Sequence, residues 1–241
     1  EAPRFMHVDI ALSGDCLGLA MGHVAGTVRN ERINDDGTVS EIPQPFVVVD
    51  LMLRVAPPPG SEIDLGKIRG FVIYLSKLYN LARVTFDQFQ SSDSIQLLRK
   101  IGIEAGHQSV DRTDEAYTML RSAFFDRRIL TYSYEPFIDE VLDLERDSKA
   151  RKVDHPLKSS KGGRGSKDVS DAVAGVVWLC TNDERARSHE SVIDMTPSEG
   201  RVRTRKKRRR KDMVKSATPS ASIPGVPSTW DELRRNLADQ S

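Results

Sequence analysis

The sequence has little cysteine and no long apolar segment. Its 241 residues contain two cysteines, Cys16 and Cys180. Two thiols are too few for a disulfide framework, and their spacing fits no zinc finger. We therefore expect reduced thiols in a cytosolic protein. No stretch reaches the roughly 18 apolar residues of a membrane-spanning helix, so no contact with a membrane is predicted.

Two further patterns are missing. The first residues, EAPRF, lack the charged and then apolar order of a signal peptide. The chain starts with Glu1 rather than Met, and a strand pattern follows almost at once, so we expect a fragment of a longer protein. The P-loop pattern G-x-x-x-x-G-K-[ST] does not occur, and ATP hydrolysis is therefore not predicted for this chain.

The net charge of +1 conceals a strong asymmetry. Residues 201–215 contain ten Lys or Arg and one acid, a net +9, which leaves about −8 for the rest of the chain. We expect a folded domain over 1–182 and a basic, disordered tail over 183–241, in which 229–238 allows one or two helical turns. The basic run predicts a flexible arm that binds DNA or a protein partner; a solvated tail without a specific role is the alternative.

The apolar pattern predicts three strands followed by alternating helices and strands. Three early strands with short links favour an antiparallel meander. Strands are expected at 5–12, 17–25, 46–55, 83–89, 103–110 and 129–134, with a polar loop at 29–41. Helices are expected at 65–79, 93–101, 113–127, 135–146 and 168–180, with a Gly/Ser/Lys loop at 154–167. This order predicts an α/β fold, an RNase H-like mixed sheet flanked by helices.

Three aspartates carry the chemical hypothesis. Asp9 lies within an apolar strand, Asp87 at the end of another strand, and Asp171 at the start of an apolar helix. Each alone has an ordinary explanation: a solvent-facing strand position, a turn, or a first-turn acid that stabilises the helix dipole. The fold brings the three elements side by side, however, and clustered acids repel each other. Two Mg²⁺ or Mn²⁺ ions, which prefer oxygen ligands and catalyse phosphodiester hydrolysis, explain the set most simply.

Three segments then resemble a known family. They are HVDIALSGDCLGLAMGH, RVTFDQFQSSDS and VDHPLKSSKGGRGSKDVSDAVAGVV, in this order. Over residues 5–180 they are similar to the nuclease domain of phage terminase large subunits. The resemblance implies that Asp9, Asp87 and Asp171 are the catalytic, metal-binding acids. Asp168 and Asp15 are further candidate ligands. His7, on the strand face of Asp9, is expected to be a packed or a surface residue rather than one that assists a metal ion or water.

The resemblance also implies an activity and partners. We expect an endonuclease that cuts concatemeric double-stranded DNA with low sequence specificity, in the host cytoplasm. The implied partners are the terminase ATPase domain, expected in an absent N-terminal part, the portal and the small terminase subunit. In the glycine-rich loop, a solvated role is one alternative and contact with the DNA backbone the other. The loop residues concerned are Lys158, Lys161, Arg164 and Lys167.

Two other functions stay open at this point. A transposase or resolvase would share the acids, but the final motif is terminase-like and no site-specific DNA-binding domain is recognisable. A non-catalytic module that binds DNA or the portal would use the acids structurally, and it predicts no dependence on divalent metal.

Overall fold

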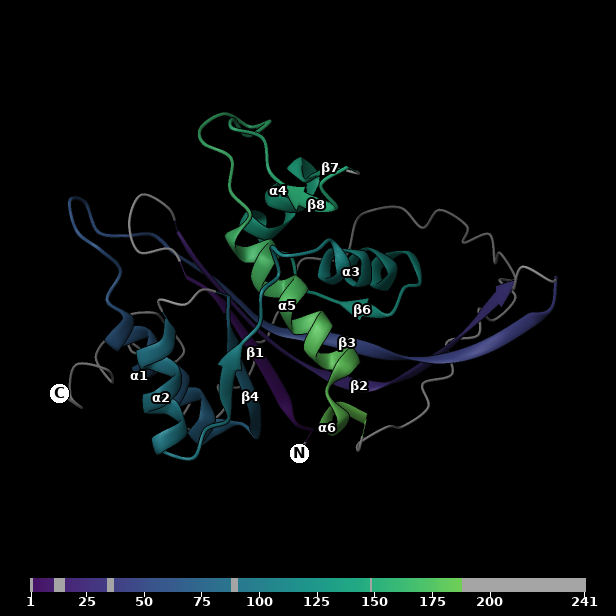
Figure 1. Cartoon of the computed structure of the whole chain (residues 1–241), viewed down its shortest axis with the longest axis horizontal. Coiled ribbons are helices and arrows are strands. Elements are labelled where there is room, and N and C mark those ends of the chain that lie inside the picture. The colour runs from purple at the N-terminus through teal and green to yellow at the C-terminus, as the bar shows by residue number, and fades with distance from the viewer. Residues whose placement is uncertain (1, 11–15, 34–36, 88–90, 148, 188–241) are drawn as a thin grey trace, which may run out of the picture. The chain divides into compact units, whose positions relative to one another are not determined.

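The computed structural model describes residues 2–10, 16–33, 37–87, 91–147 and 149–187 (Figure 1). The strands are β1 Arg4–Asp9, β2 Leu17–Ile33, β3 Val39–Val55, β4 Leu81–Phe86, β5 Ala105–His107, β6 Ile129–Leu130, β7 Glu145–Asp147 and β8 Lys152–Asp154. The helices are α1 Leu65–Leu78, α2 Ser92–Lys100, α3 Glu115–Phe125, α4 Glu135–Asp143, α5 Asp168–Asn182 and α6 Glu184–Arg187. Among the helices so described, none is long and apolar enough to cross a membrane.

The main sheet has the strand order β5-β4-β1-β2-β3-β6. Strands β1, β2 and β3 form the antiparallel meander, while β4 runs parallel to β1 and β5 parallel to β4. The short β6 extends the other edge, parallel to β3. The predicted α/β fold, a mixed RNase H-like sheet flanked by helices, is confirmed.

The loop expected at 29–41 is wrong over most of its length. Strands β2 and β3 continue through it as a long two-stranded ribbon, and their register runs to the pair Ile33 and Val39. Such a ribbon is held by backbone hydrogen bonds between its strands, so it needs no apolar side chains to mark it in the sequence. A second departure is the small hairpin of β7 and β8, which begins inside the helix expected at 135–146.

Each face of the sheet carries its own apolar core. Along β1, Phe5 belongs to the core that packs against α3 and α5, whereas Met6 and Val8 belong to the core beneath α1 and α2. This alternation follows from the period of two in a strand. Asp9 therefore lies on the face of Phe5, which is the face that α5 crosses (Figure 1).

Helix α5 approaches the sheet unusually closely, because glycines lie at the contact points. A Cβ atom on Gly18 of β2 would lie 1.8 Å from the carbonyl oxygen of Asp168. On the helix side, a Cβ on Gly175 would lie 2.3 Å from the ring of His7. Neither neighbour is the far end of a flexible side chain. The glycines thus fix the height of α5 above β1 and β2.

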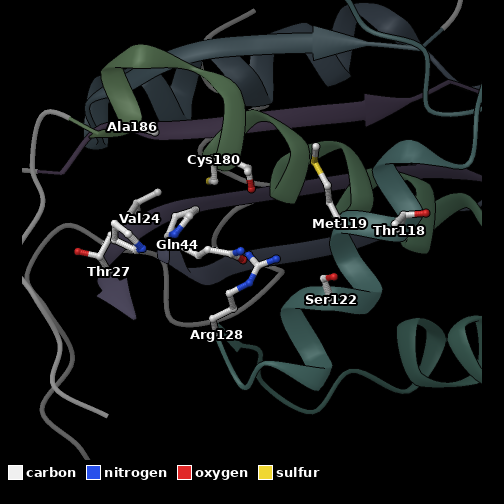
Figure 2. A pocket seen from close by; sticks show the side chains of 12 residues that line it. Val24, Thr27, Gln44, Thr118, Met119, Ser122, Arg128, Cys180 and Ala186 are labelled. Carbon is white, nitrogen blue, oxygen red and sulfur yellow. The ribbon is translucent and has the colours of Figure 1, made fainter. Parts of the chain in front are cut away.

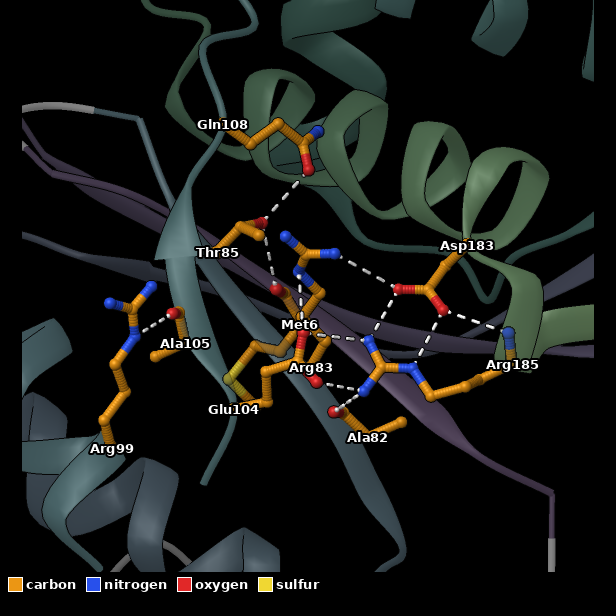
Figure 3. Close-up of polar contacts among 10 residues, drawn as sticks. All are labelled: Met6, Ala82, Arg83, Thr85, Arg99, Glu104, Ala105, Gln108, Asp183 and Arg185. Atoms are coloured by element: carbon orange, nitrogen blue, oxygen red, sulfur yellow. Dashed lines mark hydrogen bonds and ion pairs between the residues drawn. The ribbon is translucent and has the colours of Figure 1, made fainter. Parts of the chain in front are cut away.

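His7 is the polar residue beneath this contact. It is completely buried, and its Nδ1 is 2.8 Å from Oγ1 of Thr85. The Thr85 hydroxyl lies 3.2 Å from the side-chain oxygen of Gln108 (Figure 3). The Gln108 amide in turn donates to the carbonyl of Gly175 at 3.1 Å. Burial lowers the pKa of His7 to about 3, so its ring is neutral at physiological pH. The expectation that His7 packs is confirmed.

Helix α6 follows α5 beyond residue 182, where we expected the domain to end. In α6, Arg185 donates to the carbonyl of Ala82 at 3.0 Å, pairs with Asp183 at 2.7 Å and also pairs with Glu104 (Figure 3). These contacts join the end of α5 to β4 and to the segment before β5. The tail predictions for 188–241 lie outside the described residues.

Gly175→Ala should destabilise the domain by about 1–3 kcal/mol, because the added methyl group meets the His7 ring in a filled core. Gly70→Ala in α1 is the matched control: its Cβ meets nothing within 4 Å. Alanine is the better helix former by about 1 kcal/mol, so this variant should be equally or more stable than wild type. Urea unfolding checks both, and equal effects of the two substitutions would contradict the close packing.

His7 should also make stability depend on pH. Its folded-state pKa lies below the unfolded value, so its contribution is fully present above pH 6.5 and is lost as the pH falls toward about 3. At pH 4.5 the loss attributable to His7 should be roughly 2–3 kcal/mol. Urea unfolding of wild type and His7→Gln at pH 7.5 and 4.5 tests this, because the variant should lose less stability between the two values. Parallel losses would disprove it.

Candidate metal centre

Asp87, Asp168 and Asp171 lie within electrostatic range of Asp9, where β1 and β4 end and α5 begins. Asp9 is the last residue of β1, and Asp87 directly follows β4. The two strands are parallel, so their carboxyl ends share one edge, and the Asp87 amide still donates to the carbonyl of Val8 at 3.3 Å. Asp168 and Asp171 lie in the first turn of α5. Gly18, the partner of Asp9 in the β1–β2 ladder, lets that turn approach.

Asp9 is the least satisfied member of this cluster. It is 9% exposed, and no other described residue donates a hydrogen bond to its carboxylate or forms an ion pair with it. Burial raises the pKa of Asp9 well above its usual value, and the charges of Asp171, Asp87 and Asp168 raise it further. Lys167 opposes this shift. A buried carboxylate without a partner is costly, which is the condition that a bound cation relieves.

Asp171 has partners on both oxygens. The Tyr117 hydroxyl donates to Oδ1 at 2.6 Å, and the Lys167 ammonium lies 3.0 Å from Oδ2. Burial raises the pKa of Asp171 to about 7, although Lys167 opposes the shift, and the charge of Asp111 adds to it. The carboxylate is therefore held firmly in one orientation.

The remaining acids differ in their surroundings. Burial raises the pKa of Asp87, while hydrogen bonds from Ser109 and the Val110 amide oppose the shift. The buried Asp168 accepts a hydrogen bond from the Ser166 hydroxyl at 2.6 Å. Asp15, the other predicted candidate, lies outside the described residues.

Glu140 of α4 is a further buried acid near the cluster, and sequence reasoning missed it. It accepts from the Ser170 amide at 2.7 Å and from the Ser166 hydroxyl at 2.9 Å. Burial raises the pKa of Glu140. An acid at this place satisfies a free amide of the first turn of α5 and interacts favourably with the helix dipole. It thus holds the start of α5 in place.

The donor set suits a hard divalent cation, since the available oxygens are carboxylate oxygens. Within the described ranges, however, no three His, Cys, Asp or Glu side chains converge closely enough to form a ligand set. The observation that fits a cation is the unpartnered Asp9. Asp171 fits less directly, because Lys167 already neutralises it.

The glycine-rich loop folds back on itself. Positive φ angles at Gly162 and Gly163 allow a tight turn, and the Ser159 hydroxyl anchors it to Asp143 of α4 at 2.7 Å. Lys158 and Arg164 are exposed on either side of this turn. Lys161 is exposed too and pairs with Asp139 at 2.5 Å.

Lys167 differs from the other basic residues of the loop. It is 8% exposed and points into the acidic cluster, where it pairs with Asp111 and Asp171. Lys167 therefore faces the acids, which contradicts the alternative of a solvated loop lysine.

Two more residues of the cluster were not assigned to the site from sequence. The Tyr117 ring is buried in the core, and its hydroxyl donates a hydrogen bond to Asp171. Asp111 lies four residues after the end of β5, the next parallel strand at the same edge of the sheet. The order of the parallel strands could have indicated Asp111, whereas nothing in the sequence distinguished the Tyr117 hydroxyl.

A separate cleft of about 640 Å³ lies near the other end of α5 (Figure 2). Arg128, Gln44, Thr118 and Ser122 contribute polar groups to it, and Met119 and Val24 contribute apolar surface. None of the predicted site residues lines this cleft.

The similar folds are those of terminases. The large terminase of bacteriophage HK97 aligns with a TM-score of 0.48 at 13% identity, over 73% of this chain and 39% of that chain. The large terminase nuclease of thermophilic phage G20c aligns with a TM-score of 0.49 at 12% identity, over 73% of this chain and 81% of that one.

The G20c nuclease with bound magnesium gives the same TM-score at 13% identity, over 74% and 82% of the two chains. No family model and no curated protein matches the sequence. The chain aligns with about two fifths of the length of the HK97 protein. The similarity is one of fold alone.

Asp9→Asn should raise stability in metal-free buffer at pH 8, because it removes a buried charge and its repulsion by three acids. We expect a gain of about 1 kcal/mol or more, roughly 2–4 °C in Tm. Mg²⁺ should raise the Tm of wild type but not of the variant.

Asp93→Asn is the control, since Asp93 is exposed on α2, on the other side of the sheet. It should leave the response to Mg²⁺ intact. A lower Tm of Asp9→Asn in EDTA would show that the carboxylate is already satisfied within the protein.

Proposed function

We propose that this domain is the divalent-metal-dependent endonuclease of a terminase large subunit. It would hydrolyse phosphodiester bonds of concatemeric double-stranded DNA with low sequence specificity. The observation that carries the proposal is the buried, unpartnered carboxylate of Asp9 beside Asp87, Asp168 and Asp171. Acids gathered in this way make a poor structural core but a good receptor for a hard cation.

The acids have different roles in this proposal. Asp9 and Asp87, at the ends of neighbouring parallel strands, hold Mg²⁺ or Mn²⁺, and Asp168 is a further candidate ligand. A bound divalent ion activates water for attack and stabilises negative charge on the scissile phosphate. Asp171, held by Tyr117 and Lys167, adds a further negative charge to the site.

Contact with DNA is assigned to the glycine-rich loop. Lys158, Lys161 and Arg164 are exposed there, a few residues before α5, and Lys161 can exchange its Asp139 partner for a phosphate. Basic side chains that contact phosphates position DNA without reading bases. Low sequence specificity follows from this mode of binding.

The wider assembly is part of the same proposal. The ATPase motor, the portal and the small terminase subunit are the proposed partners, in the host cytoplasm. The basic run at 201–215 would add affinity for DNA that falls steeply with salt, because its charges release counterions.

One observation favours a second candidate function. The ion pair between Lys167 and Asp171 neutralises part of the cluster without any metal. A non-catalytic DNA- or portal-binding module could use the acids in this way. It predicts DNA binding that is indifferent to EDTA and no cleavage.

Plasmid cleavage separates these functions. The full chain should nick or linearise supercoiled plasmid with Mg²⁺ or Mn²⁺ and not with EDTA. Asp9→Asn and Asp171→Asn should lose at least about 100-fold in rate while still binding DNA, whereas Asp93→Asn should cut like wild type. DNA binding without cleavage in either metal, by protein that is folded and pure, would favour the binding module.

A further inference from the structure

Lys167 lies inside the acidic cluster rather than at its edge. Its side chain is 10% exposed, and its ammonium is 3.0 Å from Oδ2 of Asp171 and in contact with Oδ1 of Asp111. Its charge also acts on Asp9 and Asp87. One ammonium group therefore interacts favourably with the acidic side chains of β1, of the segments after β4 and β5, and of α5.

This is an unfavourable place for a lysine on local grounds. Lys167 is the N-cap of α5, where the helix dipole disfavours a positive charge and where Ser, Thr, Asp or Asn is the usual residue. Its side chain makes no cap hydrogen bond. The position is explained by the surrounding carboxylates and not by the helix.

The ammonium also occupies an oxygen that a metal ion would need. Oδ1 of Asp171 accepts from Tyr117, and Oδ2 faces Lys167. Each oxygen of Asp171 thus already has one partner, whereas the carboxylate of Asp9 has no hydrogen bond or ion pair among the described residues. A divalent ion at Asp9 meets open carboxylate oxygen, but a second ion at Asp171 meets a fixed positive charge.

We propose that Lys167 takes the place of the second cation, so that this site binds one divalent ion, at Asp9 and Asp87, beside a permanent ammonium. The proposal rests on the nuclease function above and replaces the two ions expected from sequence. The ammonium would stabilise negative charge on the phosphate from the Asp171 side, as a positioned cation does in other phosphoryl-transfer sites.

The test counts bound ions. The metal-free full chain is titrated with Mn²⁺ alone, and free Mn²⁺ is measured by electron paramagnetic resonance. Wild type should bind one ion, Lys167→Met two, and Lys167→Arg, which keeps the charge, one. Lys100→Met, an exposed lysine at the end of α2, is the control and should bind one.

Cleavage supplies a second readout. The rate should rise with the first power of Mn²⁺ concentration in wild type and with a steeper power in Lys167→Met. Circular dichroism checks the fold of each variant. Lys167→Met can fail to fold without metal, because Asp171 is left buried and unpaired. A count of two ions in wild type or in Lys167→Arg would still overturn the role of Lys167.

The outcomes separate the two proposals. Two ions in wild type, or one in a folded Lys167→Met, would overturn the role of Lys167 and leave the nuclease proposal standing. No ion in wild type, together with no cleavage, would overturn the metal site itself. One ion in wild type and two in Lys167→Met supports both.

Discussion

The close approach of α5 to the sheet is the contact on which the site depends. Gly18 and Gly175 remove the side chains that would otherwise separate helix and strands. Because the helix lies so low, its first turn reaches the end of β1, and Asp168 and Asp171 come within electrostatic range of Asp9. If side chains at these two positions held α5 farther from the sheet, Asp168 and Asp171 on the helix would lie farther from Asp9 and Asp87 on the strands.

The cluster in turn shapes its surroundings through charge. Buried acids need compensation, and three kinds are present: an ammonium from Lys167, a hydroxyl from Tyr117, and the amide of Ser170 offered to Glu140. Asp9 lacks such a partner among the described residues. The acids on the helix side of the cluster thus have partners for their carboxylates, whereas Asp9 on the strand side has none among the described residues. A cation would therefore bind on the strand side.

Much of this could be predicted from the sequence, and the limits have physical causes. The strand and helix periods gave the order of elements, and the fold expected from that order placed the strands of Asp9 and Asp87 side by side. The β2–β3 ribbon was missed because backbone hydrogen bonds leave no apolar pattern. Lys167 was misplaced because solvation of a side chain depends on tertiary contacts, and nothing local distinguishes a buried lysine from a loop lysine.

The contact between His7 and Gly175 has an evolutionary consequence. The imidazole fills the space that any side chain at position 175 would occupy. A larger residue at position 175 is therefore tolerable only if a smaller side chain has replaced His7 at position 7. In an alignment of related sequences the two positions, 168 residues apart, should exchange volume as a pair.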